Sequence, residues 1–400
     1  MKKLMPFVAG LVALIALLAG MALTQTPVPG ASSADLESTA KKIVTQSAGI
    51  KQGDIVLISG SIKDLELLED IAVNVRARGA FPLLTVTSQR LSHRLYTDVP
   101  SQFDSQNPEL DLKLIKMVNA IINVYRTDSL ELFADIPAER IAAQAKAYVP
   151  VNQLLNRLGI RQVSIGNGLF PTPAVARMYG VTVDELARQF WGGVNTDYTK
   201  LEARGKAIRS FLASAKEVHV TNPNGTDLRA RISGRPVFVS DGVISDEDLK
   251  IGPAGATVWL PAGEVYMAPV RGTAGGRVVI DRLDYQGEAI MGLTLDFKAG
   301  KLVSMTAKSG LESLKRLYDA AGQGKDEFAI LDFGINPDVR MIPNSNFLSW
   351  VQAGMVSIGF GDNTWAGGDN ASSFSLAGFV PGCSVMVDGK PFVDKGELQM

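Results

Sequence analysis

Leu260-Pro-Ala-Gly-Glu264-Val-Tyr-Met-Ala-Pro269 is the stretch that decides how this chain of 400 residues is interpreted. Its single acidic side chain, Glu264, follows a Pro-Ala-Gly sequence and opens a short apolar run that ends before Pro269. The stretch lies in a region of alternating strand patterns, whereas the residues before about 215 show a different pattern. Glu264 therefore belongs to the second of two regions.

Residues 35–215 have the pattern of an α/β domain. The sequence predicts a helix over 35–50 capped by Asp35, a strand over 55–58, a helix over 61–78 and a strand over 82–87. A strand, a helix and a strand this close together form a βαβ unit, so a parallel sheet is expected, with further strands at 120–124 and 162–165. No phosphate-binding glycine loop follows the first strand, and Gly166-Asn-Gly168 is interpreted as a turn.

Residues 216–400 are expected to form a mainly antiparallel β domain. Alternating runs are separated by turn sequences such as Pro223-Asn-Gly225, which is typical of hairpins, and one helix is expected over 311–321. His219 lies on the polar side of one such run, and His93 lies in a polar helical segment. Both histidines are therefore interpreted as surface residues.

Composition narrows the possible functions. The formal net charge of −1 offers no basic surface for nucleic acid, and one cysteine, Cys383, excludes an intramolecular disulfide framework. Residues 1–26 combine Lys2-Lys3 with an apolar run, which indicates a signal peptide or a membrane anchor that engages the membrane or the export machinery. Residues 27–34 form a tether, so the rest is expected to be exported to the periplasm or the cell exterior.

Several motifs, in order along the chain, give a family resemblance. They are Gly53–Ile58, Val218–Leu228, Leu260–Pro269, Gly334-Ile-Asn-Pro337 and Gly367-Gly-Asp-Asn-Ala-Ser372. Together they resemble the thermophilic aminopeptidase T family of di-metal exopeptidases. The resemblance implies an α/β domain followed by a catalytic-type β domain, a homodimer, and a metal-ligand role for Glu264.

The other metal ligands of that family are not matched. Its second glutamate falls on Ile330, with Asp332 two residues later on the same strand face as the nearest substitute. Its histidine and its His-x-Asp pair fall on Ser357, Ser375 and Ala377. Serine hydroxyls and a methyl group are poor replacements for imidazole and carboxylate ligands.

Two functions remain open from the residues. In the first, the chain is a non-catalytic protein that binds a peptide or a partner protein, with Trp365, Asp369 and Asn370 as candidate ligand-binding residues. In the second, it is a divergent metallo-aminopeptidase that removes N-terminal residues from peptides. The cofactor stays undetermined, and one weakly held divalent cation shared by Glu264 and Asp332 is a hypothesis.

Overall fold

A computed structural model describes residues 30, 32–133, 135–252, 255–285 and 288–400. The predicted targeting segment, residues 1–26, lies outside the described residues. Among the described helices, none has both the length and the apolar character that a membrane crossing requires.

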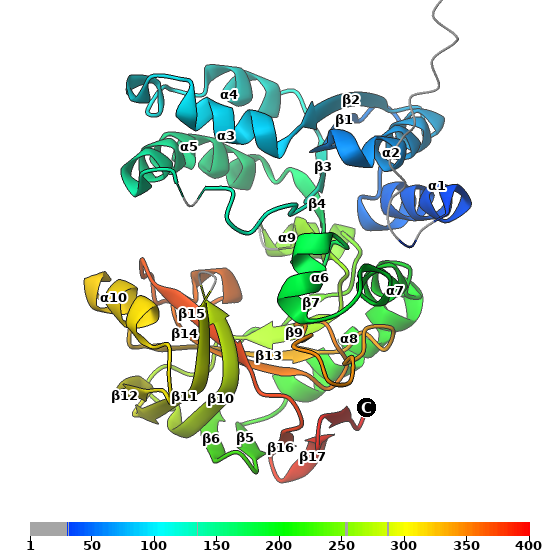
Figure 1. Cartoon of the computed structure of the whole chain (residues 1–400). Coiled ribbons are helices and arrows are strands. Elements are labelled where there is room, and N and C mark those ends of the chain that lie inside the picture. The colour runs from blue at the N-terminus through cyan, green and yellow to red at the C-terminus, as the bar shows by residue number, and fades with distance from the viewer. Residues whose placement is uncertain (1–29, 31, 134, 253–254, 286–287) are drawn as a thin grey trace, which may run out of the picture.

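The first layer is a parallel five-stranded sheet in the order β2-β1-β3-β4-β8 (Figure 1). Its strands are β1 (Ile55–Ser61), β2 (Phe81–Thr87), β3 (Ala120–Val124), β4 (Arg161–Ile165) and β8 (Thr257–Leu260). The four strands predicted before residue 215 are confirmed as parallel neighbours. The fifth, β8, comes from beyond the predicted domain boundary and pairs with β4.

Most of the described α-helices precede residue 215. They are α1 (Ser33–Lys42), α2 (Leu65–Ala77), α3 (Gln89–Thr97), α4 (Glu109–Ile115), α5 (Ala138–Leu158), α6 (Pro173–Tyr179), α7 (Val183–Val194), α8 (Tyr198–Ala213) and, later, α9 (Asp246–Ile251). The prediction that Asp35 caps the first helix is wrong. Ser32 is the cap: its hydroxyl accepts from the Asp35 N–H, and the Asp35 carboxylate accepts from the Ser32 N–H.

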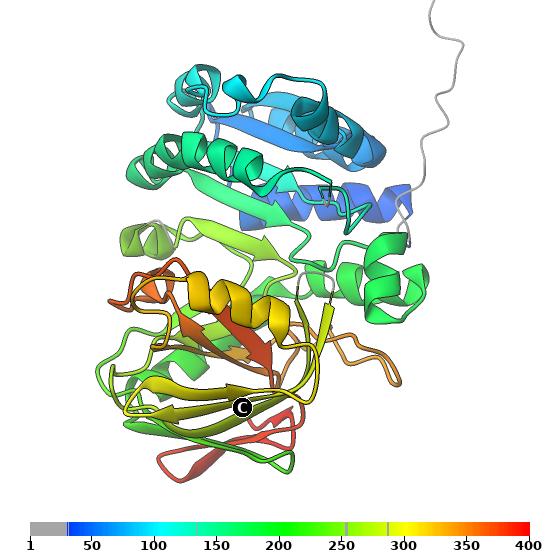
Figure 2. The same cartoon turned by 60° about the vertical axis from the view of Figure 1, so that its left-hand side comes forward.

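The second half is mainly antiparallel, as predicted, and forms two sheets that lie below the parallel sheet in Figures 1 and 2. The eight-stranded sheet contains β5 (Glu217–Asn222), β6 (Thr226–Arg231), β10 (Gly275–Tyr285), β11 (Glu288–Lys298), β12 (Lys301–Thr306), β16 (Ser384–Val387), β17 (Lys390–Asp394) and β18 (Glu397–Leu398). The five-stranded sheet, in the order β15-β14-β13-β9-β7, contains β7 (Phe238–Ser240), β9 (Glu264–Met267), β13 (Phe328–Gly334), β14 (Val356–Gly361) and β15 (Ser375–Phe379). The predicted helix is α10 (Glu312–Ala320), shown in yellow.

The stretch Leu260–Glu264 carries the chain from the parallel sheet into the five-stranded antiparallel sheet. The four carbonyls from Leu260 to Gly263 each accept a hydrogen bond. Gly166 N–H donates to Leu260 O at 2.8 Å, and Asn167 Nδ2 donates to Pro261 O at 2.9 Å. The buried Asn336 amide donates to Ala262 O at 2.6 Å, and Ile335 N–H donates to Gly263 O at 2.8 Å. These carbonyls are therefore satisfied although the crossing is buried.

Gly263 is required at the end of this crossing for two reasons. Its φ of +130° lies in a region that L-residues with a side chain rarely adopt. A Cβ at this position would also lie 2.6 Å from Cβ of Asn336 and 2.9 Å from its backbone nitrogen. The residue that directly precedes Glu264 therefore cannot carry a side chain without moving Asn336.

We expect Gly263→Ala to lower the free energy of unfolding by about 3–5 kcal/mol, since backbone strain and the clash with Asn336 act together. Urea denaturation checks this. Gly252→Ala is the matched control, because Gly252 has a φ of +105° and no described residue lies within 4 Å of an added Cβ. It should cost only about 1–2 kcal/mol. Equal losses in the two variants would contradict a specific role for the Gly263–Asn336 contact.

Candidate functional site

One face of the five-stranded antiparallel sheet brings the matched positions together. Tyr266 on β9 lies opposite Asp332 on β13, and Asp332 lies opposite Ser357 on β14. Glu264 is two residues from Tyr266, so it shares that face and lies diagonally across from Asp332. Ala377 on β15 is reached by the same register through Gly359. The site is thus built from four neighbouring strands.

Above this face lies a cavity of about 400 Å³, called here the aromatic cavity. Its lining residues are Asn167, Trp259, Glu264, Ile330, Asp332, Trp350, Trp365, Ser375 and Ala377. Three of the four tryptophans of the chain line it. Trp259 comes from β8 of the parallel sheet and Asn167 comes from the first half of the chain, so both halves of the chain contribute to the lining.

Among the described residues that line the cavity, only Glu264 and Asp332 have ionisable side chains. Asp332 is 2% exposed, and its Oδ1 has no hydrogen-bond partner among the described residues. Burial raises the pKa of Glu264 to about 7. Burial, and then the neighbouring Glu264 charge, raise the pKa of Asp332 well above its ordinary value. Neither carboxyl forms an ion pair within the described parts of the chain.

The residues predicted from the sequence divide into two groups. Glu264, Asp332 and Trp365 line the aromatic cavity, whereas Asp369 and Asn370 do not. Asp369 is exposed and lies 3.8 Å from Arg271. The buried Asn370 amide donates to the carbonyls of Gly324 and Gly361, so it holds the glycine-rich segment in place. A ligand-binding role for Asp369 and Asn370 stays a prediction.

The positions matched to missing ligands are also placed. Ile330, Ser375 and Ala377 line the cavity beside Glu264 and Asp332. Ser357 is buried below it, opposite Asp332, and its Oγ has no hydrogen-bond partner among the described residues. In the parts of the chain that the structure describes, no group of three His, Cys, Asp or Glu residues is placed to hold a metal ion.

Both histidines lie away from the aromatic cavity. His93 Nε2 is 2.9 Å from the carboxylate of Asp135, and His219 Nε2 is 2.8 Å from that of Asp227. Asp362, which precedes the glycine-rich segment, accepts hydrogen bonds from the Thr364 hydroxyl and the Ser372 N–H. Its carboxylate is therefore engaged locally.

Sequence reasoning missed three of the residues that line the cavity. Asn167 lies in the predicted turn, with a φ of +43°, and its amide holds the Pro261 carbonyl. Trp259 is 44% exposed between buried Val258 and Leu260, an alternation that is visible in the sequence. Trp350 lies in a loop and is held by Phe379, with ring centroids 4.7 Å apart. That long-range contact leaves no local signal.

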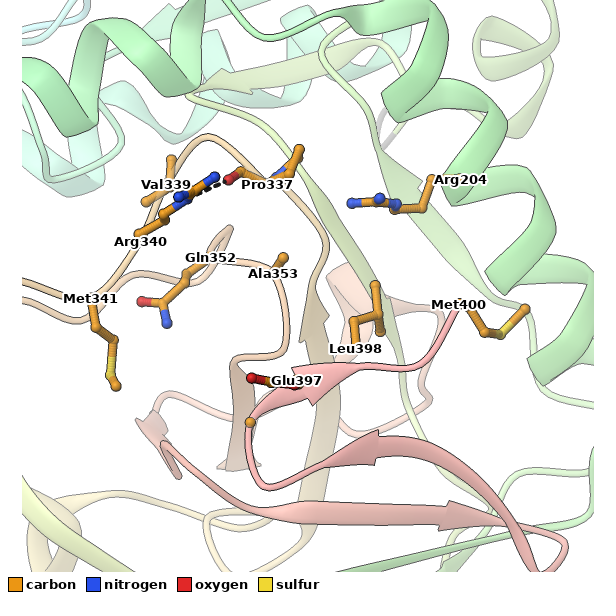
Figure 3. Close-up of a pocket in the computed structure, with 11 residues that line it drawn as sticks. Arg204, Pro337, Val339, Arg340, Met341, Gln352, Ala353, Glu397, Leu398 and Met400 are labelled. Atoms are coloured by element: carbon orange, nitrogen blue, oxygen red, sulfur yellow. Dashed lines mark hydrogen bonds between the residues drawn. The ribbon is translucent and has the colours of Figure 1, made fainter.

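A second cavity, of about 460 Å³, is shown in Figure 3 near the last residues of the chain. Its charged residues are Arg204, Arg340 and Glu397. Arg204 donates to the carbonyl of Ile335, and Arg340 donates to that of Pro337. Since one carboxylate side chain lines this cavity and both guanidinium groups contact the backbone, it has no equivalent of the Glu264–Asp332 pair.

Comparison with known proteins identifies the family of the chain. The family model described as thermophilic metalloprotease (M29) matches residues 32–333. The chain is 23% identical over 312 residues to aminopeptidase PepS from Streptococcus thermophilus, covering 71% of this chain and 72% of that protein. It is 24% identical over 313 residues to aminopeptidase 2 from Geobacillus stearothermophilus, covering 71% and 73%.

Solved structures agree on the fold. Wild-type AmpT from Thermus thermophilus matches with a TM-score of 0.72 at 19% identity, over 92% of this chain and 100% of that chain. A 2,5-dihydroxypyridine dioxygenase from Pseudomonas putida KT2440 matches with a TM-score of 0.57 at 14% identity, over 92% and 98%. The chain belongs to the M29 family of aminopeptidase-like metallopeptidases.

The raised pKa of Glu264 predicts how stability changes with pH. The folded state holds the proton up to about pH 7, whereas an ordinary glutamate releases it near 4.5. The contribution of the protonated Glu264 carboxyl to the free energy of unfolding is therefore fully present below about pH 4.5. It is lost as the pH rises through 7. In metal-free buffer, we expect Glu264→Gln to be more stable than the parent by about 1–3 kcal/mol above pH 7 and equally stable near pH 4.5.

Thermal denaturation with a chelator at both pH values measures this difference. Glu327→Gln is a suitable control, because the buried Glu327 pairs with Arg271 and Lys301 and its loss should destabilise the protein. A Glu264→Gln variant that is less stable than the parent above pH 7 would mean that the carboxylate has a favourable partner in the folded protein.

Restoring ligand residues tests the matching of positions. We expect Ile330→Glu, Ser357→His, Ser375→His and Ala377→Asp together to bind Zn²⁺ at least about a hundredfold more tightly than the parent, with proton release. Isothermal titration calorimetry measures both quantities. Adding Glu264→Gln to the four changes is the control and should remove most of the gain. No gain in a folded quadruple variant would mean that these positions do not converge on one site.

Proposed function

We propose that this chain is an exported, non-catalytic member of the M29 family that binds a peptide or a partner protein in the aromatic cavity. The observation that carries the proposal is the set of side chains around Glu264 and Asp332. Ile330, Ser375 and Ala377 occupy the positions where the family resemblance implies metal ligands. A pair of metal ions about 3.5–4 Å apart needs several imidazole and carboxylate ligands, and two carboxyl groups do not fit that need.

The surroundings of the cavity support a ligand larger than an ion. Trp350 lines the aromatic cavity, and Phe379, against which it packs, lines a neighbouring cavity of about 500 Å³. This neighbouring cavity has Tyr179 and Asn346 among its lining residues. Apolar walls with a few polar groups are typical of sites for organic ligands, and two adjoining cavities offer room for successive residues of a peptide. Export is proposed from residues 1–26 alone.

The proposal predicts that metal-replete protein holds less than one transition-metal ion per chain and does not hydrolyse aminoacyl chromogenic substrates. Elemental analysis after dialysis and initial-rate assays with Zn²⁺, Co²⁺ or Mn²⁺ measure these properties. An M29 aminopeptidase with its full ligand set, assayed in parallel, is the positive control. Two bound ions with turnover that is lost in Glu264→Gln would contradict the proposal and identify a divergent metallo-aminopeptidase.

A further inference from the structure

The walls of the aromatic cavity are specialised in a way that metal binding does not require. Trp259 stacks on Tyr125 with ring centroids 5.9 Å apart and planes 23° apart. Trp365 packs on Tyr266 at 5.4 Å, and Trp350 packs edge-on against Phe379 at 4.7 Å. Each indole that lines the cavity is thus supported by a second ring that does not line it. The three indoles are held in place before any ligand arrives.

The floor of the cavity carries uncompensated acidic groups. Glu264 and Asp332 lie on adjacent strands, and none of the described residues that line the cavity is cationic. Oδ1 of Asp332 is buried without a hydrogen-bond partner in the described residues. A buried polar atom of this kind is costly unless a ligand satisfies it. The cavity therefore suits a cationic ligand, whose charge or N–H groups would lie against Glu264 and Asp332.

The chemistry of the walls identifies the kind of cation. A small hard metal ion needs six or more oxygen ligands, and the oxygen-bearing side chains here are Asn167, Glu264, Asp332 and Ser375. Tryptophan rings attract cations through their electron-rich faces, and they favour organic cations because these are weakly hydrated. N-linked methyl or methylene groups would also gain contacts with the indoles and with Ile330 and Ala377.

We propose that the aromatic cavity recognises an N-alkylated ammonium group at the end of a peptide, such as a secondary or N-methylated amino terminus. The tryptophans surround the alkyl groups, while Glu264 and Asp332 balance the charge. This inference rests on the proposed peptide-binding function and specifies its ligand. A bare primary ammonium is bound less well because it is strongly hydrated and leaves the apolar walls without contact.

The test uses the tryptophans of the cavity as probes, since ligand binding there changes their fluorescence. The purified protein is titrated in chelator at neutral pH with trialanine, N,N-dimethyl-trialanine and N-acetyl-trialanine. The dimethylated peptide should bind at least roughly tenfold more tightly than trialanine, and the neutral acetylated peptide should not bind. The inference would be overturned if trialanine bound as tightly as its dimethyl form. It would also be overturned if the acetylated peptide bound with an affinity similar to that of the dimethylated peptide.

Two variants separate the contributions of wall and floor. Trp365→Leu, at a position that is 48% exposed, should remove most of the preference for the dimethylated peptide. Glu264→Gln should weaken both cationic peptides. Phe103→Leu, at an exposed aromatic outside the cavity, is the matched control and should leave binding unchanged. An unchanged preference in folded Trp365→Leu would also overturn the inference.

A free cation distinguishes failure of this inference from failure of the proposed function. Choline and its neutral isostere 3,3-dimethylbutan-1-ol are titrated in the same way. Choline binding without any peptide binding would support the cation-selective cavity and overturn the peptide-binding function. Tight binding of all three peptides without preference, and equal binding of choline and its isostere, would support peptide binding and overturn the cation selectivity.

Discussion

The amide of Asn336 is the contact on which the arrangement of the two halves depends. This side chain is fully buried and donates to Ala262 O at 2.6 Å and to Gly193 O at 3.1 Å. Ala262 belongs to the crossing between the two sheets, and Gly193 belongs to α7. The Asn336 side chain, in the loop that follows β13, therefore connects the crossing to α7 of the first half. Without it, two buried carbonyls would lack partners.

The same crossing determines where the acidic residues of the cavity lie. Gly263 approaches Asn336 closely, and β9 begins at the next residue, so the position of Glu264 along its strand is determined by the turn before it. The register with β13 then brings Asp332 onto the same face. Trp259 also lines the cavity, because β8 leads directly into the same crossing. The wall and the floor of the cavity are thus parts of one continuous stretch of chain.

Local patterns predicted the elements well because helices and strands reflect periodicity within short segments. The strands over 120–124 and 162–165 are examples, and the two-residue period that relates Ile330 to Asp332 placed both correctly on the cavity face. Pairing between segments that are distant in the sequence could not be predicted from these local patterns. Nothing within Thr257–Leu260 indicates that it joins β4, and nothing near Trp350 indicates Phe379 as its partner. Likewise, Asp369 and Asn370 have the same local sequence context, but only the three-dimensional structure reveals that one is exposed and the other supports the loop.

The membership of β8 in the parallel sheet has a consequence for how the chain acquires its structure during synthesis. β4 is complete at residue 165, but its outer neighbour is made only when residues 257–260 are available. Until then, the edge of β4 presents unpaired backbone groups, which are a route to misassembly. β9 in turn waits for β13, which ends at residue 334. The edge of β4 therefore stays open in the nascent chain for nearly a hundred residues of elongation. A fragment that ends at residue 215 lacks β8, so its β4 edge would stay open permanently.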